Sequence, residues 1–408
     1  MSDQAALLQW QMELAKWLPV LSVAQVRVLG EWSLGMVLSR SCALTAVTLW
    51  WAVETGQASG TVRQRLREWC YPAERKRGTK RQELDVERCF GPLLAWVVAT
   101  WTGRQLALAL DATTLGDRFV VLAISVVYRG CAIPVAWAVV AAGQKRAWRP
   151  EWERLLGLLR GAVPADWTVI VLADRGLYAR WLFTTIVGMG WHPFLRVNLG
   201  GSFRPTGRTS FRPFGTFVPN ADQRWSGTGQ AFKGATSRLT CTLLAWHGSG
   251  YADPWLVLTD LPPEQADVAW YGLRAWIEQG FKVTKRAGWQ WQRTRMTDPD
   301  RAARLWLAVA VATLWLVSVG GAADAALPDA TIPHLPDLPA PLPTSRARLR
   351  TRLRLVGVFR RGWYLILAAL VRHAALPLAR FFPEPWPALP LPHPAHPAPA
   401  ASLTRLAA

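Results

Sequence analysis

Two aspartates stand where carboxylates could carry out chemistry. Asp111 ends the apolar run LALALD, and Asp174 ends the apolar run VIVLAD. Each run has the length and composition of a buried strand. If the two strands are neighbours in an open α/β sheet, both carboxylates emerge at the same edge, where such sheets build their sites. The alternative is that each aspartate only caps the turn after its strand.

A third acid, Glu278, lies within the basic and aromatic stretch YGLRAWIEQGFKVTKR at 271–286. On the helix predicted there, four side chains share an arc of about 60°: those of Tyr271, Arg274, Glu278 and Lys285. A solvated helix face usually alternates acids with bases, whereas this one presents a single acid flanked by cations. That suits a carboxylate that binds a divalent cation beside phosphates held by Arg274 and Lys285.

The charge of the chain indicates a polyanionic partner. The chain has 47 Lys and Arg against 27 Asp and Glu, a formal net charge of +20, which is typical of proteins that bind nucleic acid or anionic membranes. Residues 61–81 alone carry eight cations, with Arg63 and Arg67 on one helix face. These cations could simply form a solvated, charged face, but the net charge favours contact with phosphates.

Several features predict where the protein works. Its five cysteines include no C-x-x-C pair, which favours a reducing compartment and neither a disulfide framework nor a zinc site. The first twenty residues lack the pattern of a signal peptide, so we expect a cytoplasmic protein. The uncharged segment 305–323 approaches the length of a membrane span, but its strongly apolar part has only about 15 residues, so we expect a buried core helix.

The pattern of the chain predicts an α/β fold with a mixed sheet and flanking helices. Strands are expected at 105–111, 118–128, 131–142, 166–174, 191–197 and 254–260, the second and third forming a hairpin around Arg129 and Gly130. A long helix is expected over 261–286. The expected regions are a helical 1–100, a core at 101–197 and 251–326, a β-rich insertion at 198–250, a Pro-rich linker at 327–345, a basic helical segment at 346–380 and a disordered Pro/Ala tail at 381–408.

These motifs together resemble a known family. Tyr271, Arg274, Glu278 and Lys285 reproduce the Tyr-x2-Arg-x3-Glu-x6-Lys signature of a large group of bacterial insertion-sequence transposases of the cut-and-paste DDE class. LALDATTL is similar to the first-Asp motif of that family, and VLADRGLYA to the second. The order Asp, Asp, Glu matches, as does the β-rich insertion before the Glu. The resemblance covers roughly residues 60–320.

The resemblance implies an RNase H-like catalytic domain in which Asp111, Asp174 and Glu278 bind two Mg²⁺ or Mn²⁺ ions. Two such ions would promote hydrolysis of phosphodiester bonds at transposon ends and strand transfer into target DNA. Arg274 and Lys285 would hold phosphates, and Tyr271 would position the DNA backbone. The implied partner is double-stranded DNA, bound by a homodimer through a DNA-binding region at 1–100, in the bacterial cytoplasm near the nucleoid, with no membrane involved.

Other interpretations stay open at this stage. An RNase H-like nuclease that cuts without joining would use the same three acids, and a retired transposase could survive as a DNA-binding protein. Arg175, beside the second Asp, contacts DNA or pairs with a neighbour. Three tryptophans are candidates for stacking on an unpaired base: Trp225, Trp289 and Trp291.

Overall fold

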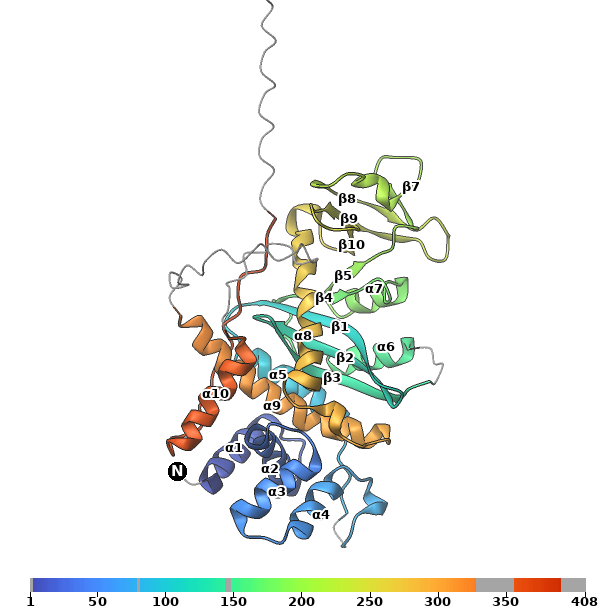
Figure 1. Ribbon diagram of the computed structural model, residues 1–408. Helices are drawn as coiled ribbons and strands as arrows, with labels where there is room; N and C mark the ends of the chain where they lie inside the picture. Colours follow the sequence, from blue (N-terminus) through green and yellow to red (C-terminus); the bar gives the residue numbers. More distant parts are fainter. Residues whose placement is uncertain (1–2, 79–80, 144–147, 328–355, 390–408) are drawn as a thin grey trace, which may run out of the picture.

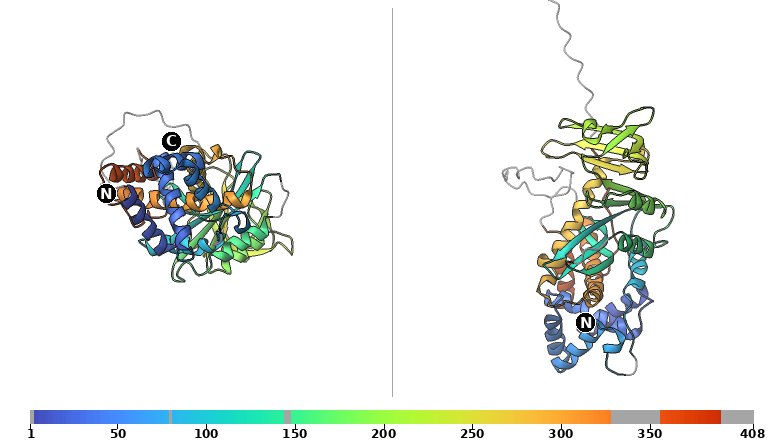
Figure 2. Two further views of the ribbon diagram at one scale, coloured as in Figure 1. Left: turned by 90° about the horizontal axis from the view of Figure 1, so that it is seen from below. Right: turned by 90° about the vertical axis from the view of Figure 1, so that its right-hand side faces the viewer.

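The computed structural model describes residues 3–78, 81–143, 148–327 and 356–389, which form an elongated α/β protein (Figure 1). Helices α1 to α4 lie at one end and the β-rich residues 202–247 at the other, and the right-hand view in Figure 2 shows the same order. The predicted mixed α/β class is confirmed. The role of each predicted region remains a prediction.

One mixed sheet of ten strands runs through the described residues in the order β3-β2-β1-β4-β5-β10-β9-β8-β6-β7. Strand β4 is parallel to β1 and to β5, while the other neighbours are antiparallel. The strands are β1 Gln105–Leu115, β2 Phe119–Tyr128, β3 Cys131–Ala141, β4 Thr168–Ala173, β5 His192–Arg196, β6 Ser202–Pro205, β7 Arg212–Pro213, β8 Gln223–Ala231, β9 Leu239–His247 and β10 Trp255–Thr259. Because β10 pairs with both β5 and β9, the residues at 198–250 extend the sheet of the core.

The predicted hairpin is confirmed. Strands β2 and β3 pair from Phe119–Ala141 to Tyr128–Cys131, and the two turn residues, Arg129 and Gly130, have φ angles of 46° and 80°. Two consecutive positive φ angles are the requirement of a type I′ turn, which matches the twist of a hairpin. The hairpin is buried because helices cover it on both sides.

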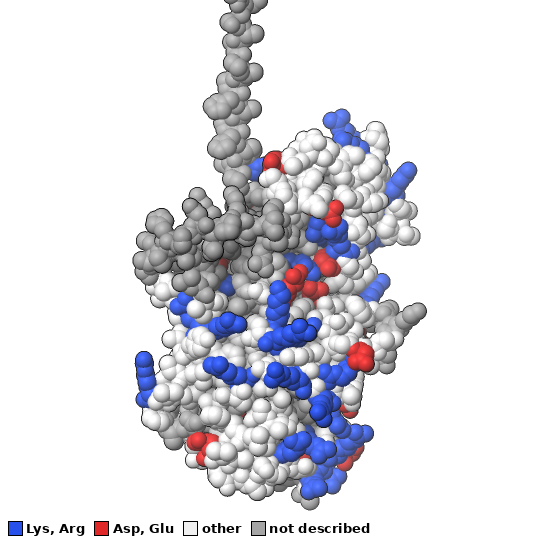
Figure 3. Space-filling view, viewed as in Figure 1, with Lys and Arg blue, Asp and Glu red and all other residues white. Residues whose placement is uncertain are grey.

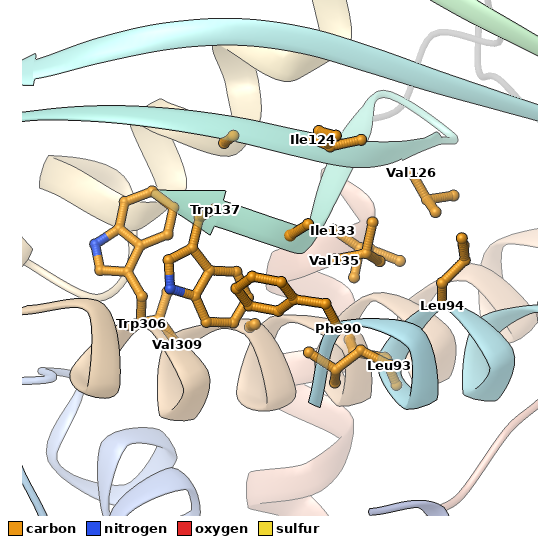
Figure 4. Packing of buried hydrophobic residues seen from close by; sticks show 14 of the residues in the cluster. Phe90, Leu93, Leu94, Ile124, Val126, Ile133, Val135, Trp137, Trp306 and Val309 are labelled. Atoms are coloured by element: carbon orange, nitrogen blue, oxygen red, sulfur yellow. The ribbon is translucent and has the colours of Figure 1, made fainter. Parts of the chain in front are cut away.

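Helices α5 (Phe90–Ala99) and α9 (Pro299–Ala325) cover one face of this hairpin (Figure 4). Trp137 of β3 packs against Phe90 and Trp306, and its indole Nε1 donates to the carbonyl of Ala303 at 3.0 Å. Helix α9 is long and apolar enough to cross a membrane, but 94% of its most apolar window is buried inside the protein. It is a core helix, as its interrupted apolar run predicts.

The remaining helices surround this core. They are α1 Asp3–Trp17, α2 Val23–Ser39, α3 Leu44–Thr55, α4 Ser59–Trp69, α6 Arg149–Leu158, α7 Arg180–Val187, α8 Ala275–Lys282 and α10 Val358–Val371. Arg304 of α9 is buried and donates to the carbonyl of Cys70 at 2.8 Å and to Glu83. These contacts tie the N-terminal helices to the core. All five cysteines are buried and free.

The end of the chain agrees with the predicted helical segment, since α10 lies within 346–380, but differs from the predicted disordered tail. Helix α10 packs so closely on α9 that a Cβ atom at Gly320 would lie 1.9 Å from the carbonyl oxygen of Val358. Phe381 is fully buried, and its carbonyl accepts from Thr102. The prediction of disorder is therefore wrong for 381–389, because aromatic side chains there find apolar partners. Residues 328–355, which include most of the predicted linker and the start of the predicted basic segment, and residues 390–408 lie outside the described residues.

The predicted long helix at 261–286 is also wrong. The segment consists of two 3₁₀ turns, Pro263–Gln265 and Val268–Arg274, followed by α8 and a π-helical turn, Val283–Ala287. The π turn contains a kink at Lys285, where φ is −85° and ψ is −105°. Functional sites are frequent places for such single π turns.

Candidate active site

Asp111 and Asp174 come together where two parallel strands part. The last register pair of β1 and β4 is Leu110 with Ala173, so the two aspartates follow in adjacent positions. The prediction that Asp111 ends its strand is wrong. Strand β1 continues to Leu115 along β2, and Asp111 lies opposite Ala123. The strand is therefore held on one side only beyond Asp111, which leaves its carboxylate accessible beside Asp174.

Helix α8 brings the third acid to this edge. Glu278 lies in its first turn, where the positive end of the helix dipole favours a carboxylate. The helix approaches β3 closely because residue 280 is glycine: a Cβ atom there would lie 2.8 Å from the Cβ of Ala132. Gly280 thus sets the height of Glu278 above the sheet.

The guanidinium of Arg274 bridges all three acids. Its Nη2 donates to Asp111 Oδ2 at 2.9 Å and to Asp174 Oδ2 at 3.2 Å, and its Nη1 donates to Glu278 Oε1 at 3.3 Å. Oxygens bonded to one nitrogen are at most about 6 Å apart. Three acids separated by 63 and 104 residues in the sequence therefore converge on one cation.

The three carboxylates have different environments. The exposed fractions of their side chains are 18% for Asp111, 40% for Asp174 and 58% for Glu278. Burial raises the pKa of the Asp111 carboxyl above its ordinary value, while the charge of Arg274 and a hydrogen bond from the Ala112 amide counteract part of this rise. Asp111 is therefore the acid that depends most on a nearby cation.

The donor set fits a hard divalent cation. Carboxylate oxygens are the ligands that Mg²⁺ and Mn²⁺ prefer, and Arg274 already occupies the position of a shared cation between them. Among the described residues, no group of three acids, histidines or cysteines is arranged around one point as a ready-made metal cluster. The guanidinium stands between the carboxylates, so a metal must compete with it for their oxygens.

The side chain of Lys285 reaches strand β1 at Thr113, two residues after Asp111. Its Nζ donates to the hydroxyl of Thr113 at 2.7 Å. Burial lowers the pKa of the Lys285 ammonium, and the charge of Arg286 lowers it further. The kink in the π turn is what directs this side chain toward the strand. Thr113 was not singled out as a partner by the sequence, because the kink has no sequence signal.

Tyr271 is a correction to the predicted set. Its side chain is only 5% exposed and packs edge-on against Trp255, with ring centroids 5.3 Å apart. Burial raises the pKa of its hydroxyl, which hydrogen bonds with Arg196. Its burial leaves Tyr271 little surface to offer a DNA backbone in this structure. It supports the 3₁₀ turn that carries Arg274, since residues three apart in such a turn lie on one side.

Other residues predicted to contact DNA have protein partners in this structure. Arg175 pairs with Asp253 at 2.9 Å while both side chains stay partly exposed, so its contact with DNA stays a prediction. Trp289 and Trp291 are fully buried and cannot stack on a base, and Trp225 packs against Phe217.

The predicted phosphate contacts on α4 lie apart from the acids. Arg63 and Arg67 are both exposed. Arg63 donates to the Thr45 hydroxyl at 3.0 Å, and Arg67 donates to the hydroxyl of Tyr71. Figure 3 shows Lys and Arg side chains spread over the face that carries α8, with a group of acidic side chains among them. This face has the charge that a polyanion requires.

A comparison with protein families agrees with this geometry. No curated protein matches the chain. The model of the family described as "Transposase DDE domain" matches residues 106–315, more than half of the 408 residues, and includes all three acids. The strand order β3-β2-β1-β4-β5 within this match is consistent with an RNase H-like transposase domain. The chain belongs to the transposase DDE domain family.

Proposed function

We propose that the protein is an insertion-sequence transposase that cuts phosphodiester bonds at transposon ends and joins the freed ends to target DNA. The observation that carries this proposal is the convergence of Asp111, Asp174 and Glu278 on a single guanidinium. A protein that merely bound DNA would have no use for three carboxylates gathered on a basic face, because they repel phosphates.

Asp111, Asp174 and Glu278 would hold the Mg²⁺ or Mn²⁺ ions. Bound divalent ions supply activation of a water or 3′-hydroxyl nucleophile and stabilisation of the leaving oxygen. The chain itself contributes the placement of the acids at the edge where β1 and β4 part. It also contributes cations for the phosphates beside the scissile bond, for which Arg274 and Lys285 are the proposed donors.

Arg274 has two sets of partners in this proposal. It pairs with the three carboxylates in the structure, yet its buried Nε has no hydrogen-bond partner among the described residues. A DNA phosphate would offer the guanidinium a planar, bidentate arrangement that also uses Nε. Arg274 would then leave the carboxylates to the metal. Binding of DNA and binding of metal would thus favour each other.

The remaining parts of the proposal concern the setting. We propose that the protein acts as a homodimer on paired DNA ends, that residues 1–100 contribute to DNA binding, and that it works in the bacterial cytoplasm. The net charge of +20 supports DNA binding and the five buried free cysteines support a reducing compartment, while the homodimer rests on the resemblance to the family.

The experiment uses duplexes that carry the inverted repeats flanking the gene, incubated with the purified protein and Mg²⁺. Asp111→Asn, Asp174→Asn and Glu278→Gln should each abolish cleavage and leave binding of the ends intact. Asp166→Asn is a matched control, because Asp166 precedes the opposite end of β4 and pairs with Arg104 on the surface. Normal cleavage by any of the three acid variants would overturn the assignment of that acid.

A second reaction separates transposase from nuclease. Pre-cut ends with free 3′-hydroxyls are offered to the wild-type protein together with a plasmid. Joined products support the transposase. Cleavage of intact ends without any joining would replace the proposal with a nuclease that uses the same acids.

A further inference from the structure

A basic pocket of about 400 Å³ lies between the N-terminal helices and the segment that follows α8. One wall comes from α4 and its neighbours, and the other from residues 293–301. Five arginines line it: Arg63, Arg67, Arg293, Arg295 and Arg301. We refer to it as the arginine pocket.

The arginines that line the arginine pocket greatly outnumber its acids. Asp298 is the only acid in its lining, and it lies 3.6 Å from the Nε of Arg301. The guanidinium groups of Arg293 and Arg295 make no hydrogen bond or ion pair with any described residue, and both side chains are exposed. Some surface arginines elsewhere have an acidic partner, as Arg149 has in Glu153.

Two of the arginines in the pocket are held in place by a neighbouring aromatic ring. Arg301 lies over the ring of Tyr71, with 4.2 Å between its guanidinium carbon and the ring centroid, and Arg67 donates to the hydroxyl of the same tyrosine. Two guanidinium groups are thus held in place by one aromatic side chain. Arginines fixed in this way lose little rotamer freedom when they bind phosphate.

The arginine pocket continues from the element that carries the candidate active site. Along the chain, Glu278 on α8 is followed by the cations Lys282, Lys285 and Arg286 and then by the pocket wall at Arg293. Figure 3 shows Lys and Arg side chains following this course, from the acidic group down to the N-terminal helices. A strand lying over the acids would therefore meet the pocket on the same face.

From these observations we infer that the arginine pocket is a second DNA site, which binds the phosphate backbone of the same DNA that lies over the three acids. The inference rests on the proposed function and adds to it a place where the N-terminal helices and the catalytic domain grip one duplex together. Each phosphate neutralised there releases condensed counterions.

The test measures how binding of a flanking-end duplex depends on salt, with full-length protein in the Asp111→Asn background so that no cleavage intervenes. The variant combines Arg293→Gln and Arg295→Gln, whose guanidinium groups have no partner among the described residues. The slope of log K against log salt should fall by about two, and affinity near 0.1 M salt should fall roughly tenfold or more. Thermal unfolding should be unchanged.

The matched control removes the same charge elsewhere, by Arg372→Gln and Arg380→Gln, beyond α10, where both side chains are exposed. An equal loss of slope in the control would show a general charge effect and overturn the inference, as would an unchanged slope in the pocket variant. If millimolar inorganic phosphate alone displaced the duplex from the protein, the pocket would be reassigned to free phosphate.

Cleavage by the protein with intact acids separates this inference from the proposed function. If that protein cuts ends but the pocket variant binds with an unchanged slope, only the arginine pocket is wrong. If that protein neither binds nor cuts the ends, the proposed function itself fails.

Discussion

Replacing Arg274 with glutamine should make the protein less stable without metal and tighter in binding metal. Arg274 is 13% exposed and Asp111 18% exposed, so their bond at 2.9 Å is a charge-assisted hydrogen bond in a partly buried place, worth about 1.5–3 kcal/mol. The pairs with the more exposed Asp174 and Glu278 add about 0–1 kcal/mol each. We therefore expect Arg274→Gln to lower the free energy of unfolding by about 2 kcal/mol.

The free energy of this lost pairing also sets the expected gain in affinity for the metal. A metal that enters the wild-type site must first separate the guanidinium from the carboxylates, whereas in Arg274→Gln it meets three uncompensated acids. A difference of about 2 kcal/mol corresponds to about 10- to 30-fold tighter binding of Mn²⁺. DNA should tighten Mn²⁺ binding in the wild-type protein and have a smaller effect in Arg274→Gln, because the coupling through the guanidinium is lost.

Titration calorimetry with Mn²⁺ and thermal unfolding with and without Mn²⁺ are the assays. Arg175→Gln is the control, since Arg175 adjoins Asp174 in sequence but pairs away from it with Asp253, and its Mn²⁺ affinity should equal that of the wild type. Unchanged or weaker Mn²⁺ binding by Arg274→Gln would refute the idea that guanidinium and metal compete for the same oxygens.

Three further predictions follow from contacts of the site and its support. Burial raises the folded-state pKa of Asp111 even though the charge of Arg274 counteracts part of the rise, so the stabilising contribution of the protonated form is complete below the ordinary aspartate pKa and is lost as the pH rises through the raised pKa; in urea unfolding, Asp111→Asn should therefore gain stability relative to the wild type as the pH rises above the ordinary aspartate range. Gly280→Ala should push α8 from β3, abolish cleavage and cost about 1–3 kcal/mol, while Gly157→Ala, where a Cβ meets nothing within 4 Å, should leave cleavage intact. Asp324→Asn should cost about 1–3 kcal/mol in the same unfolding assay, because buried Arg129, now 2.8 Å from Asp324, keeps only the more exposed carboxylate of Glu384 at 3.4 Å as an acidic partner; an unchanged free energy of unfolding would show that Glu384 alone compensates Arg129.

Much of the fold could be predicted because local patterns agree with the final environment. The apolar runs before Asp111 and Asp174 are buried strands, as their composition indicates, and Arg129 with Gly130 makes the expected turn. The convergence of the two aspartates was predicted on the condition that their strands are neighbours, and the parallel pairing of β1 with β4 meets that condition. These predictions needed no information beyond the strand patterns themselves.

The errors arose where tertiary packing decides the outcome. The periodicity around Tyr271 fits a helix, but burying its ring against Trp255 requires a 3₁₀ turn instead. Proline-rich composition predicts disorder after 381, yet Phe381 and Trp386 find apolar partners. Whether Arg274 faces a phosphate or a carboxylate also depends on its neighbours in three dimensions, and the spacing of residues along a helix does not reveal them.

The late C-terminal segment bears on when the protein becomes competent during its synthesis. The indole of Trp386 packs on Trp270, with ring centroids 4.7 Å apart, and the amide of Leu389 donates to Asp267, which lies 122 residues earlier. Both contacts hold the turn that presents Arg274. A nascent chain that has released all three acids but not yet residues 386–389 lacks these contacts, so the centre acquires its full support only after those residues have also emerged from the ribosome.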